Sequence, residues 1–166
     1  MTTEDNLKSA FAGESQANRK YLAFAKKADQ EDLKQVAKLF RAAADAETVH
    51  AHNHLKVLDG IKTTAENLQE AIDGETHEFT EMYPKMIEEA ESEGNQAAKI
   101  SFSKANTVEK THAGLYQKAL ESVKQEKDLE EKDIYVCQIC GHTVEGEAPD
   151  TCPVCSANKE QFKKIE

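Results

Sequence analysis

The sequence lacks any surplus of basic charge, because 21 lysines and arginines stand against 31 acidic residues, for a formal net charge of −10. A nucleic-acid-binding protein would need a basic face, so the composition argues against that class of partner. The sequence also lacks an apolar run long enough to span a membrane. Its first residues, Met1-Thr-Thr-Glu-Asp5, have neither the basic start nor the apolar stretch of a signal peptide. These absences favour a cytoplasmic protein.

Cysteine and proline are almost absent from most of the chain. Residues 1–128 hold no cysteine and a single proline, Pro84, whereas all four cysteines fall in the last 32 residues. Between these regions, eight of the ten residues in 124–133 are charged, which is typical of a helix that ends in a solvated linker. We therefore predict two domains, at residues 1–130 and 131–166.

Four stretches have apolar residues at steps of three and four, the pattern of amphipathic helices. They run over residues 7–28, 36–57, 78–90 and 98–123. Short breaks near Gln30–Asp32 and Gly94–Asn95 join them into two antiparallel hairpins. Gly60 caps the second stretch, and about fourteen residues, with a short helical piece at 67–74, then lead to the third. Two hairpins joined by a long crossover predict an all-α four-helix bundle of the ferritin-like type.

The unit Glu-x-x-His occurs twice within these stripes, at Glu47–His50 and at Glu109–His112. Residues i and i+3 of a helix share a face, so each unit directs a carboxylate and an imidazole to one point. Bundles that bind two irons or two manganese ions use two such units and one further Glu from each of the other two helices. Glu14 and Glu78 supply these, 33 and 31 positions before the next unit. Glu81 is a seventh donor, with no counterpart in the first half.

A single Glu in such a stripe is usually an acid at a helix edge with its carboxylate in water. Five converging carboxylates, however, would repel one another without a cation. Hard oxygen donors with a few imidazoles suit iron or manganese better than copper, and zinc would not use so many acids. Tyr21 and Tyr83 lie where a phenol can hydrogen-bond a ligand carboxylate, although packing alone also explains Tyr21. Pro84 should bend the third helix beside its acids.

Two Cys-x-x-Cys pairs, Cys137–Cys140 and Cys152–Cys155, are separated by eleven residues. Together they predict a tetrahedral four-sulfur metal site, for which zinc and iron both remain open. Gly141 supplies the positive φ of the first turn, whereas Ser156 holds the matching place in the second, so that turn is either slightly strained or built differently. His142 is expected on the exposed side and not as a ligand. About thirty residues cannot form a core alone, so this module should unfold without its metal.

In order and spacing these motifs closely resemble the rubrerythrin family along nearly the whole chain. The matching segments are Gly13-Glu-Ser-Gln-Ala17, the two Glu-x-x-His units, Glu78-Phe-Thr-Glu-Met-Tyr-Pro84 and the Cys-x-x-Cys-Gly…Cys-Pro-x-Cys tail. The resemblance implies a ferritin-like di-iron domain followed by a small rubredoxin-like domain of strands and loops. It implies two irons in a carboxylate-bridged site and one iron in a rubredoxin-type site of four cysteines.

The resemblance also implies the ligand roles. Glu47 and Glu109 would bridge the irons, and the terminal ligands would be Glu14, Glu78, Glu81, His50 and His112. The third iron would take Cys137, Cys140, Cys152 and Cys155. On reduction one iron would exchange Glu81 for His50, so the expected catalytic residues are Glu47, His50, Glu81 and Glu109.

The activity implied by the resemblance is that of a cytoplasmic peroxidase that reduces hydrogen peroxide to water. Two electrons are needed, and the rubredoxin-type centre would return them singly from an external donor, a rubredoxin or an NAD(P)H-dependent reductase. A head-to-tail homodimer is implied, in which the four-cysteine site of one subunit serves the di-iron site of the other. The alternatives are a ferroxidase or iron-handling protein and a binding or sensing protein with a zinc ribbon. Iron storage has no use for an electron inlet, which favours the peroxidase.

Overall fold

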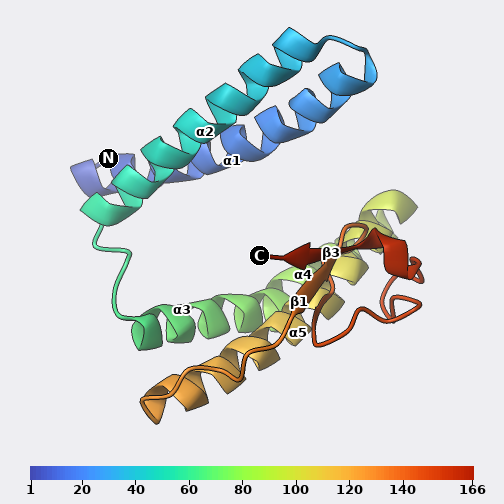
Figure 1. Cartoon of the computed structure of the whole chain (residues 1–166). Helices are drawn as coiled ribbons and strands as arrows, with labels where there is room; N and C mark the ends of the chain where they lie inside the picture. The colour runs from blue at the N-terminus through green and yellow to red at the C-terminus, as the bar shows by residue number, and fades with distance from the viewer. The chain divides into compact units, whose positions relative to one another are not determined.

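The computed structural model describes all of residues 1–166, and the chain divides into two compact units, residues 1–62 and 63–166. The first unit is a helical hairpin, and the second combines three α-helices with a small sheet (Figure 1). The expected fold class, a helical protein with a small C-terminal metal domain of strands and loops, is confirmed. None of the helices is both long and apolar enough to cross a membrane.

The hairpin consists of α1 (Thr3–Gln30) and α2 (Lys34–Val57), which run antiparallel. A capping box begins α1, because the Thr2 hydroxyl accepts from the backbone N–H of Asp5 while the Asp5 carboxylate accepts from that of Thr2. Asp32, with φ of 57°, makes the tight turn into α2. The buried residues of the hairpin are all alanines, in chain order Ala25, Ala28, Ala37, Ala44 and Ala51. Small side chains at these positions let the two helices approach closely.

The C-terminus of α2 is closed by a Schellman motif. Asp59 takes the left-handed conformation, with φ of 53°, and the N–H of Gly60 donates to the carbonyl of Leu55. The left-handed residue is therefore Asp59 and not the glycine. Gly60 is needed for another reason, because a Cβ at this position would lie 2.4 Å from Cδ1 of Leu55. The expected end of the second helix is confirmed to within a few residues.

The third helix begins much earlier than the sequence pattern indicated. A second capping box, between Thr63 and Glu66, begins α3 (Thr64–His77), which absorbs the short helical piece expected at 67–74. The connection between α2 and α3 is therefore only the six residues Leu58–Thr63, against the fourteen or so expected. The capping box was visible in the sequence as Thr-x-x-Glu, and its acid and hydroxyl fix the helix start.

The helix then passes through a π-helical turn, η1 (Glu78–Met82), into α4 (Tyr83–Ser92). Pro84 lies in the first turn of α4 and lacks the N–H that would continue the α-helical ladder. The expected irregularity beside Pro84 is thus a π-turn, which shifts the helical period by one residue. Gly94, with φ of 70°, turns the chain into α5 (Gln96–Lys124). Against α5 pack α3 and α4, burying Ile72, Ala90, Val108 and Leu120.

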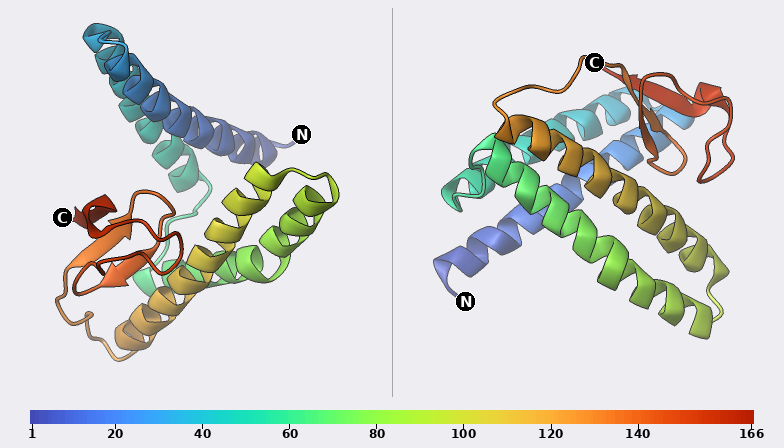
Figure 2. Two further views of the ribbon diagram at one scale, coloured as in Figure 1. Left: turned by 90° about the vertical axis from the view of Figure 1, so that its right-hand side faces the viewer. Right: turned by 90° about the horizontal axis from the view of Figure 1, so that it is seen from below.

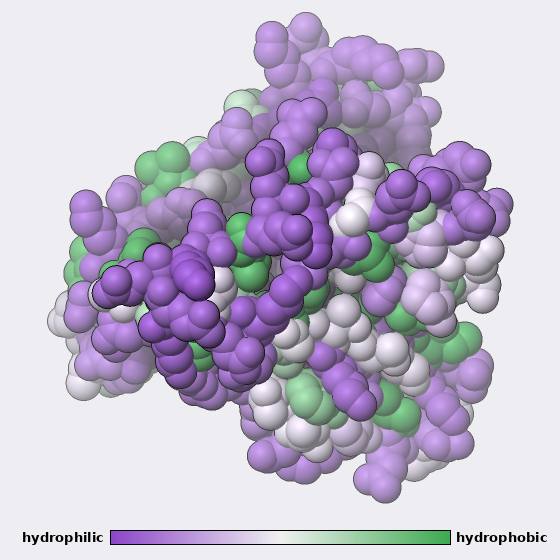
Figure 3. Space-filling view, turned by 60° about the horizontal axis from the view of Figure 1, so that its bottom comes forward, coloured by the Kyte–Doolittle hydropathy of each residue, from purple (hydrophilic) through white to green (hydrophobic).

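The C-terminal segment forms a three-stranded antiparallel sheet in the order β2-β1-β3. Its strands are β1 (Ile134–Cys137), β2 (Thr143–Glu145) and β3 (Phe162–Ile165), with a single 3₁₀ turn, η2 (Lys159–Gln161), before β3. The sheet lies beside α5 in both views of Figure 2. Hydrophilic residues dominate the face of the molecule drawn in Figure 3, and hydrophobic residues appear there only in separate small groups.

Candidate metal centres

Triad 1, which we define as Glu14, Glu47 and His50, lies on the hairpin and brings three metal-capable groups within 4.8 Å of one another. Nδ1 of His50 lies 2.9 Å from a carboxylate oxygen of Glu47 and 3.9 Å from one of Glu14. Hydrogen bonding with Glu47 raises the pKa of Glu14, while hydrogen bonds from Glu14 and His50 lower the pKa of Glu47. The opposed shifts show that the two carboxyl groups face each other across the hairpin.

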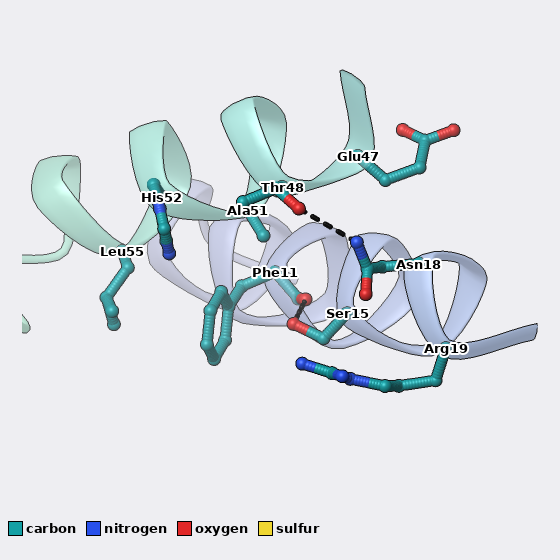
Figure 4. A pocket seen from close by; sticks show the side chains of 9 residues that line it. All are labelled: Phe11, Ser15, Asn18, Arg19, Glu47, Thr48, Ala51, His52 and Leu55. Carbon is teal, nitrogen blue, oxygen red and sulfur yellow. Dashed lines mark hydrogen bonds between the residues drawn. The ribbon is translucent and has the colours of Figure 1, made fainter. Parts of the chain in front are cut away.

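A polar contact fixes α1 against α2 beside this triad. The side-chain amide of Asn18 donates to the Thr48 hydroxyl and to the Ala44 carbonyl, at 2.8 and 2.7 Å. Asn18 and Thr48 belong to the wall of a cavity of about 230 Å³ drawn in Figure 4. Glu47 also lines this cavity, and in Figure 4 its carboxylate points away from Ser15 and Asn18. The contact sets the register that places Glu14 opposite Glu47.

Triad 2, which we define as Glu75, Glu109 and His112, lies between α3 and α5. Nδ1 of His112 lies 2.9 Å from Glu109 and 3.6 Å from Glu75. Glu78 lines the same open cavity of about 400 Å³. Burial, and then the charges of Glu109 and Glu78, raise the pKa of Glu75 to about 7. A carboxyl group with so raised a pKa, in a cavity beside other acids, is typical of a functional site.

Of the seven O/N donors predicted from the sequence, Glu14, Glu47 and His50 lie together on the hairpin, and Glu109 and His112 lie together with Glu75 in the second unit. Glu78 lines the cavity beside that second group. Glu75 was missed. The internal repeat held the signal, because Glu75 precedes Glu109 by 34 positions, close to the 33 that separate Glu14 from Glu47.

Glu81 does not lie with these donors. Its side chain is 59% exposed, and its nearest charged partners are His77 at 3.9 Å and Lys85 at 4.0 Å. The reason is the π-turn, whose extra residue breaks the i, i+3 relation that would have placed Glu81 on the face of Glu78.

Of the two tyrosines, only Tyr83 lies beside a triad. Burial and the charges of Glu109, Glu78 and Glu75 raise the pKa of the Tyr83 phenol. Tyr21 packs instead against Phe24 and Phe40, with ring centroids 6.3 and 6.2 Å apart. Aromatic packing therefore accounts for the position of Tyr21.

The four cysteines are unpaired by disulfides and their sulfur atoms gather within 4.8 Å of one another. The two turns are built alike, since Gly141 N–H donates to Cys137 O and Ser156 N–H donates to Cys152 O. Ser156 accordingly adopts φ of 61°, a strained value for a residue with a Cβ. Burial acts to raise the pKa of Cys152, but backbone N–H groups of Cys155 and Val154 lower it to about 7. Such donors favour the thiolates that a metal requires.

The sequence suggested that His142 lies on the exposed side of its turn, but the structure does not place it there. Its side chain is half-buried, its Nδ1 is buried without a hydrogen-bond partner, and burial together with the nearby His112 lowers its pKa. The first Cys turn packs toward α5, so the residue after Gly141 is covered.

A hydrogen-bonded bridge joins the Cys-rich module to triad 2. Nε2 of His112 lies 2.9 Å from the Thr143 hydroxyl, which donates to the Gly141 carbonyl at 3.1 Å. Because the hydroxyl uses its proton on that carbonyl, it accepts from Nε2–H of His112. Nδ1, which lies 2.9 Å from a carboxylate oxygen of Glu109, is then the ring nitrogen that a metal would take. The Nε2–H contact is the outer-sphere hydrogen bond usual for a ligand histidine. An ion pair between Lys118 and Glu145 holds the same two elements together.

The donor sets fit iron at both kinds of site. Carboxylates with one imidazole per triad suit hard or borderline cations, and four converging sulfurs suit iron or zinc. Each Glu/His triad offers donors of the kind that a di-iron site uses, and the four cysteines would hold one further iron.

Comparisons with known proteins identify the family of the chain. Residues 5–120 match the family model Rubrerythrin, and residues 135–163 match the model for the rubrerythrin rubredoxin-like domain. Rubrerythrin-2 of Clostridium acetobutylicum is 36% identical, covering 97% of this chain and 95% of that protein. Nigerythrin of Nitratidesulfovibrio vulgaris is 34% identical, covering 97% and 85%.

A solved structure of nigerythrin, in the mixed-valence state, matches 99% of this chain and 87% of that chain with a TM-score of 0.58 and 33% identity. The two family models, the relatives and the donor sets all indicate the same family. The chain therefore belongs to the rubrerythrin family, whose members carry a ferritin-like di-iron domain and a rubredoxin-like iron domain with four cysteine ligands.

Proposed function

We propose that the protein is a peroxidase that reduces hydrogen peroxide to water. The observation that carries this proposal is the bridge from His112 through Thr143 to Gly141, because it attaches a one-electron module to a ligand of the di-metal site. The family consists in general of oxidoreductases, and the reduction of one peroxide consumes two electrons and two protons. When bound, a pair of irons supplies the two electrons. An iron-storage protein has no need of the attached module.

The proposed ligand set contains seven O/N donors, namely Glu14, Glu47, His50, Glu75, Glu78, Glu109 and His112. Glu47 and Glu109 would bridge, as the family resemblance implies. Glu81 is left out of this set, because its exposed carboxylate faces His77 and Lys85. Peroxide is a small polar molecule with two O–H groups. The open cavity provides carboxylate oxygens that can accept a hydrogen bond from each of them, and its lining includes Glu75, Glu78, Glu109 and His112.

The chain's own residues define a short electron path. It runs from Cys140 through the peptide to Gly141, across the hydrogen bond to Thr143, and across a second to the ring of His112. The resemblance implied that the four-cysteine site of one subunit serves the irons of the other. In this chain the module instead contacts a ligand of its own triad 2, so we propose that it delivers electrons there.

The remaining assignments are proposals of the same kind. We propose a boundary near residue 130, within the charged segment 124–133, and a cytoplasmic location. The electron donor is a rubredoxin or an NAD(P)H-dependent reductase, which would dock near the exposed Ile139 beside Cys140.

Stopped-flow mixing of the fully reduced, iron-loaded protein with hydrogen peroxide and with dioxygen tests the activity. We expect peroxide to oxidise the di-iron site in a single fast phase, one peroxide per site, and dioxygen to react much more slowly. A faster reaction with dioxygen, or oxidation of added ferrous iron in large excess over the sites, would instead indicate a ferroxidase.

A further inference from the structure

The charges of the protein are unevenly distributed along the chain. Residues 15–41, which surround the turn between α1 and α2, hold seven lysines and arginines against three acidic residues. Their balance is +4 and the net charge of the chain is −10, so the remaining residues together carry −14. A basic segment in so acidic a chain attracts anions that the rest of the surface would repel.

A cavity of about 430 Å³ opens within this segment, and we call it the basic cavity. It combines three cationic side chains with small or apolar ones, and its lining residues are Arg19, Leu22, Ala23, Ala25, Lys26 and Arg41. Sites for small ligands have this size and this composition, with apolar walls and a few convergent polar groups. The basic cavity therefore has the make-up of a binding site for a small anion.

Two of its three cations have no acidic partner. The side chains of Arg19 and Lys26 form no ion pair or hydrogen bond, whereas Nη1 of Arg41 donates to a carboxylate oxygen of Asp29 at 2.8 Å. That ion pair holds the Arg41 guanidinium against α1 and leaves its other N–H groups available as donors. Three cations and one acid leave an excess of two positive charges, so a complementary ligand carries at least two negative charges.

The basic cavity lies on a different face of the hairpin from triad 1. At about 100° per residue, Arg19 and Lys26 project roughly 120–140° around α1 from Glu14. Arg19 also lines the neighbouring cavity drawn in Figure 4, so the two cavities meet at this side chain. None of the donors of triad 1 lines the basic cavity. A ligand there is bound by chemistry that is separate from that of the metal centres.

We propose that the basic cavity binds a small organic phosphate with a diphosphate group on an apolar body, the chemistry of a nucleoside diphosphate. Guanidinium groups bind phosphate oxygens through paired N–H donors, and Lys26 adds a point charge. A diphosphate balances the excess of two positive charges, whereas a single carboxylate would leave one cation unneutralised. Leu22 and Ala23 provide apolar surface for the body of the ligand. This site is independent of the proposed peroxidase activity.

Isothermal titration calorimetry of the iron-loaded, full-length protein with ADP tests the site. We expect one saturable site per chain, and binding that weakens as salt is added. Adenosine lacks the phosphates and should bind at least about tenfold more weakly. The absence of saturable ADP binding, or equal binding of adenosine, would overturn the proposal.

Paired charge variants separate the cavity from the general charge of the hairpin. Arg19→Gln with Lys26→Gln should weaken ADP binding by about tenfold or more, because both unpaired cations are lost. Lys20→Gln with Lys38→Gln is the matched control, since it removes the same charge from the same segment at exposed positions outside the cavity. The control should change the affinity by less than about threefold. Equal losses in the two variants would mean diffuse attraction of polyanions, and unchanged binding in the first would place ADP elsewhere; either result contradicts the proposal.

A further variant keeps all three cations. Ala23→Glu adds an acid to the lining at an exposed helical position, where Glu is well tolerated, and should weaken ADP binding by about tenfold or more. Ala12→Glu, exposed on α1 but outside the cavity, is its control and should bind ADP like the native chain. Iron content and the reaction with peroxide should be unchanged in both. Native affinity in Ala23→Glu would show that ADP does not occupy the basic cavity.

Discussion

Triad 1 and triad 2 use the same chemical unit in unequal surroundings. His50 in triad 1 is 54% exposed and its partners are the acids of its own triad, whereas His112 in triad 2 is 26% exposed and also bonded to Thr143. Triad 2 has Glu78 and Tyr83 beside it as well. The comparison teaches that a repeated motif need not give equivalent half-sites. The second is held in place by outer contacts and adjoins the four-cysteine module, while the first is more exposed.

Removal of the four-cysteine module, the proposed electron inlet beside triad 2, should have the largest effect on peroxide turnover. Deletion of residues 135–166 removes the four-cysteine site and the hydrogen-bond partner of His112. We expect turnover of peroxide with an external reductase to fall to background, while a reduced sample is still oxidised once by peroxide. Steady-state and single-turnover assays on the same preparation measure the two quantities. Normal turnover in the truncated chain would show that electrons enter elsewhere.

The choice between Glu75 and Glu81 should give the next largest effect. Glu75→Gln removes a charged donor of triad 2, so iron affinity should fall by more than the roughly 10–100-fold cost of losing an outer-sphere partner. Glu81→Gln is the matched control on the neighbouring π-turn and should change affinity by less than about twofold, because the side chain is solvated. Equilibrium competition with a chelator measures both. The reverse order of effects would restore Glu81 as the ligand.

Loss of the Thr143 hydroxyl should have a smaller effect, confined to triad 2. Thr143→Val removes the acceptor that fixes His112, and we expect iron affinity to fall about tenfold, at the low end of outer-sphere effects. The rate of electron transfer from the iron of the four-cysteine site should fall with it. Thr143→Ser keeps the hydroxyl and should restore both. If valine and serine behave alike, the contact is packing and not a positioning hydrogen bond.

The smallest effect should be a pH dependence of stability in the metal-free protein. The folded-state pKa of Glu75 is raised from 4.5 to about 7, so the folded state binds more protons than the unfolded state between these values. Stability should therefore fall as pH rises through this window, by about a few degrees in Tm. Glu75→Gln should flatten the slope, and so should bound iron. In triad 1 the pKa shifts of Glu14 and Glu47 have opposite directions. A slope that survives Glu75→Gln would have to come from other groups.

The parts of the site that follow from local spacing could be predicted from the sequence. Glu47 with His50, Glu109 with His112 and the two Cys-x-x-Cys turns each lie within one element, so helical or turn geometry alone brings their donors together. The internal repeat and the amphipathic pattern likewise indicated the helical hairpins and the ferritin-like class.

The other features of the site could not be predicted from helical periodicity. Glu75 was missed because the third helix was expected to begin at Glu78, although the Thr63–Glu66 capping box marked an earlier start. Glu81 lies apart from the other acids because the π-turn before Pro84 changes the helical period. The contact between His112 and Thr143 joins residues 31 positions apart and depends on how the sheet packs on α5. No local pattern encodes such a contact.

Iron content per chain tests the central claim most directly, namely that two triads and one four-cysteine site all hold iron. After reconstitution with iron, elemental analysis should find about three irons per chain, and about two in the chain that lacks residues 135–166. One metal or fewer per full-length chain, or zinc in the helical site under iron-replete conditions, would contradict the account.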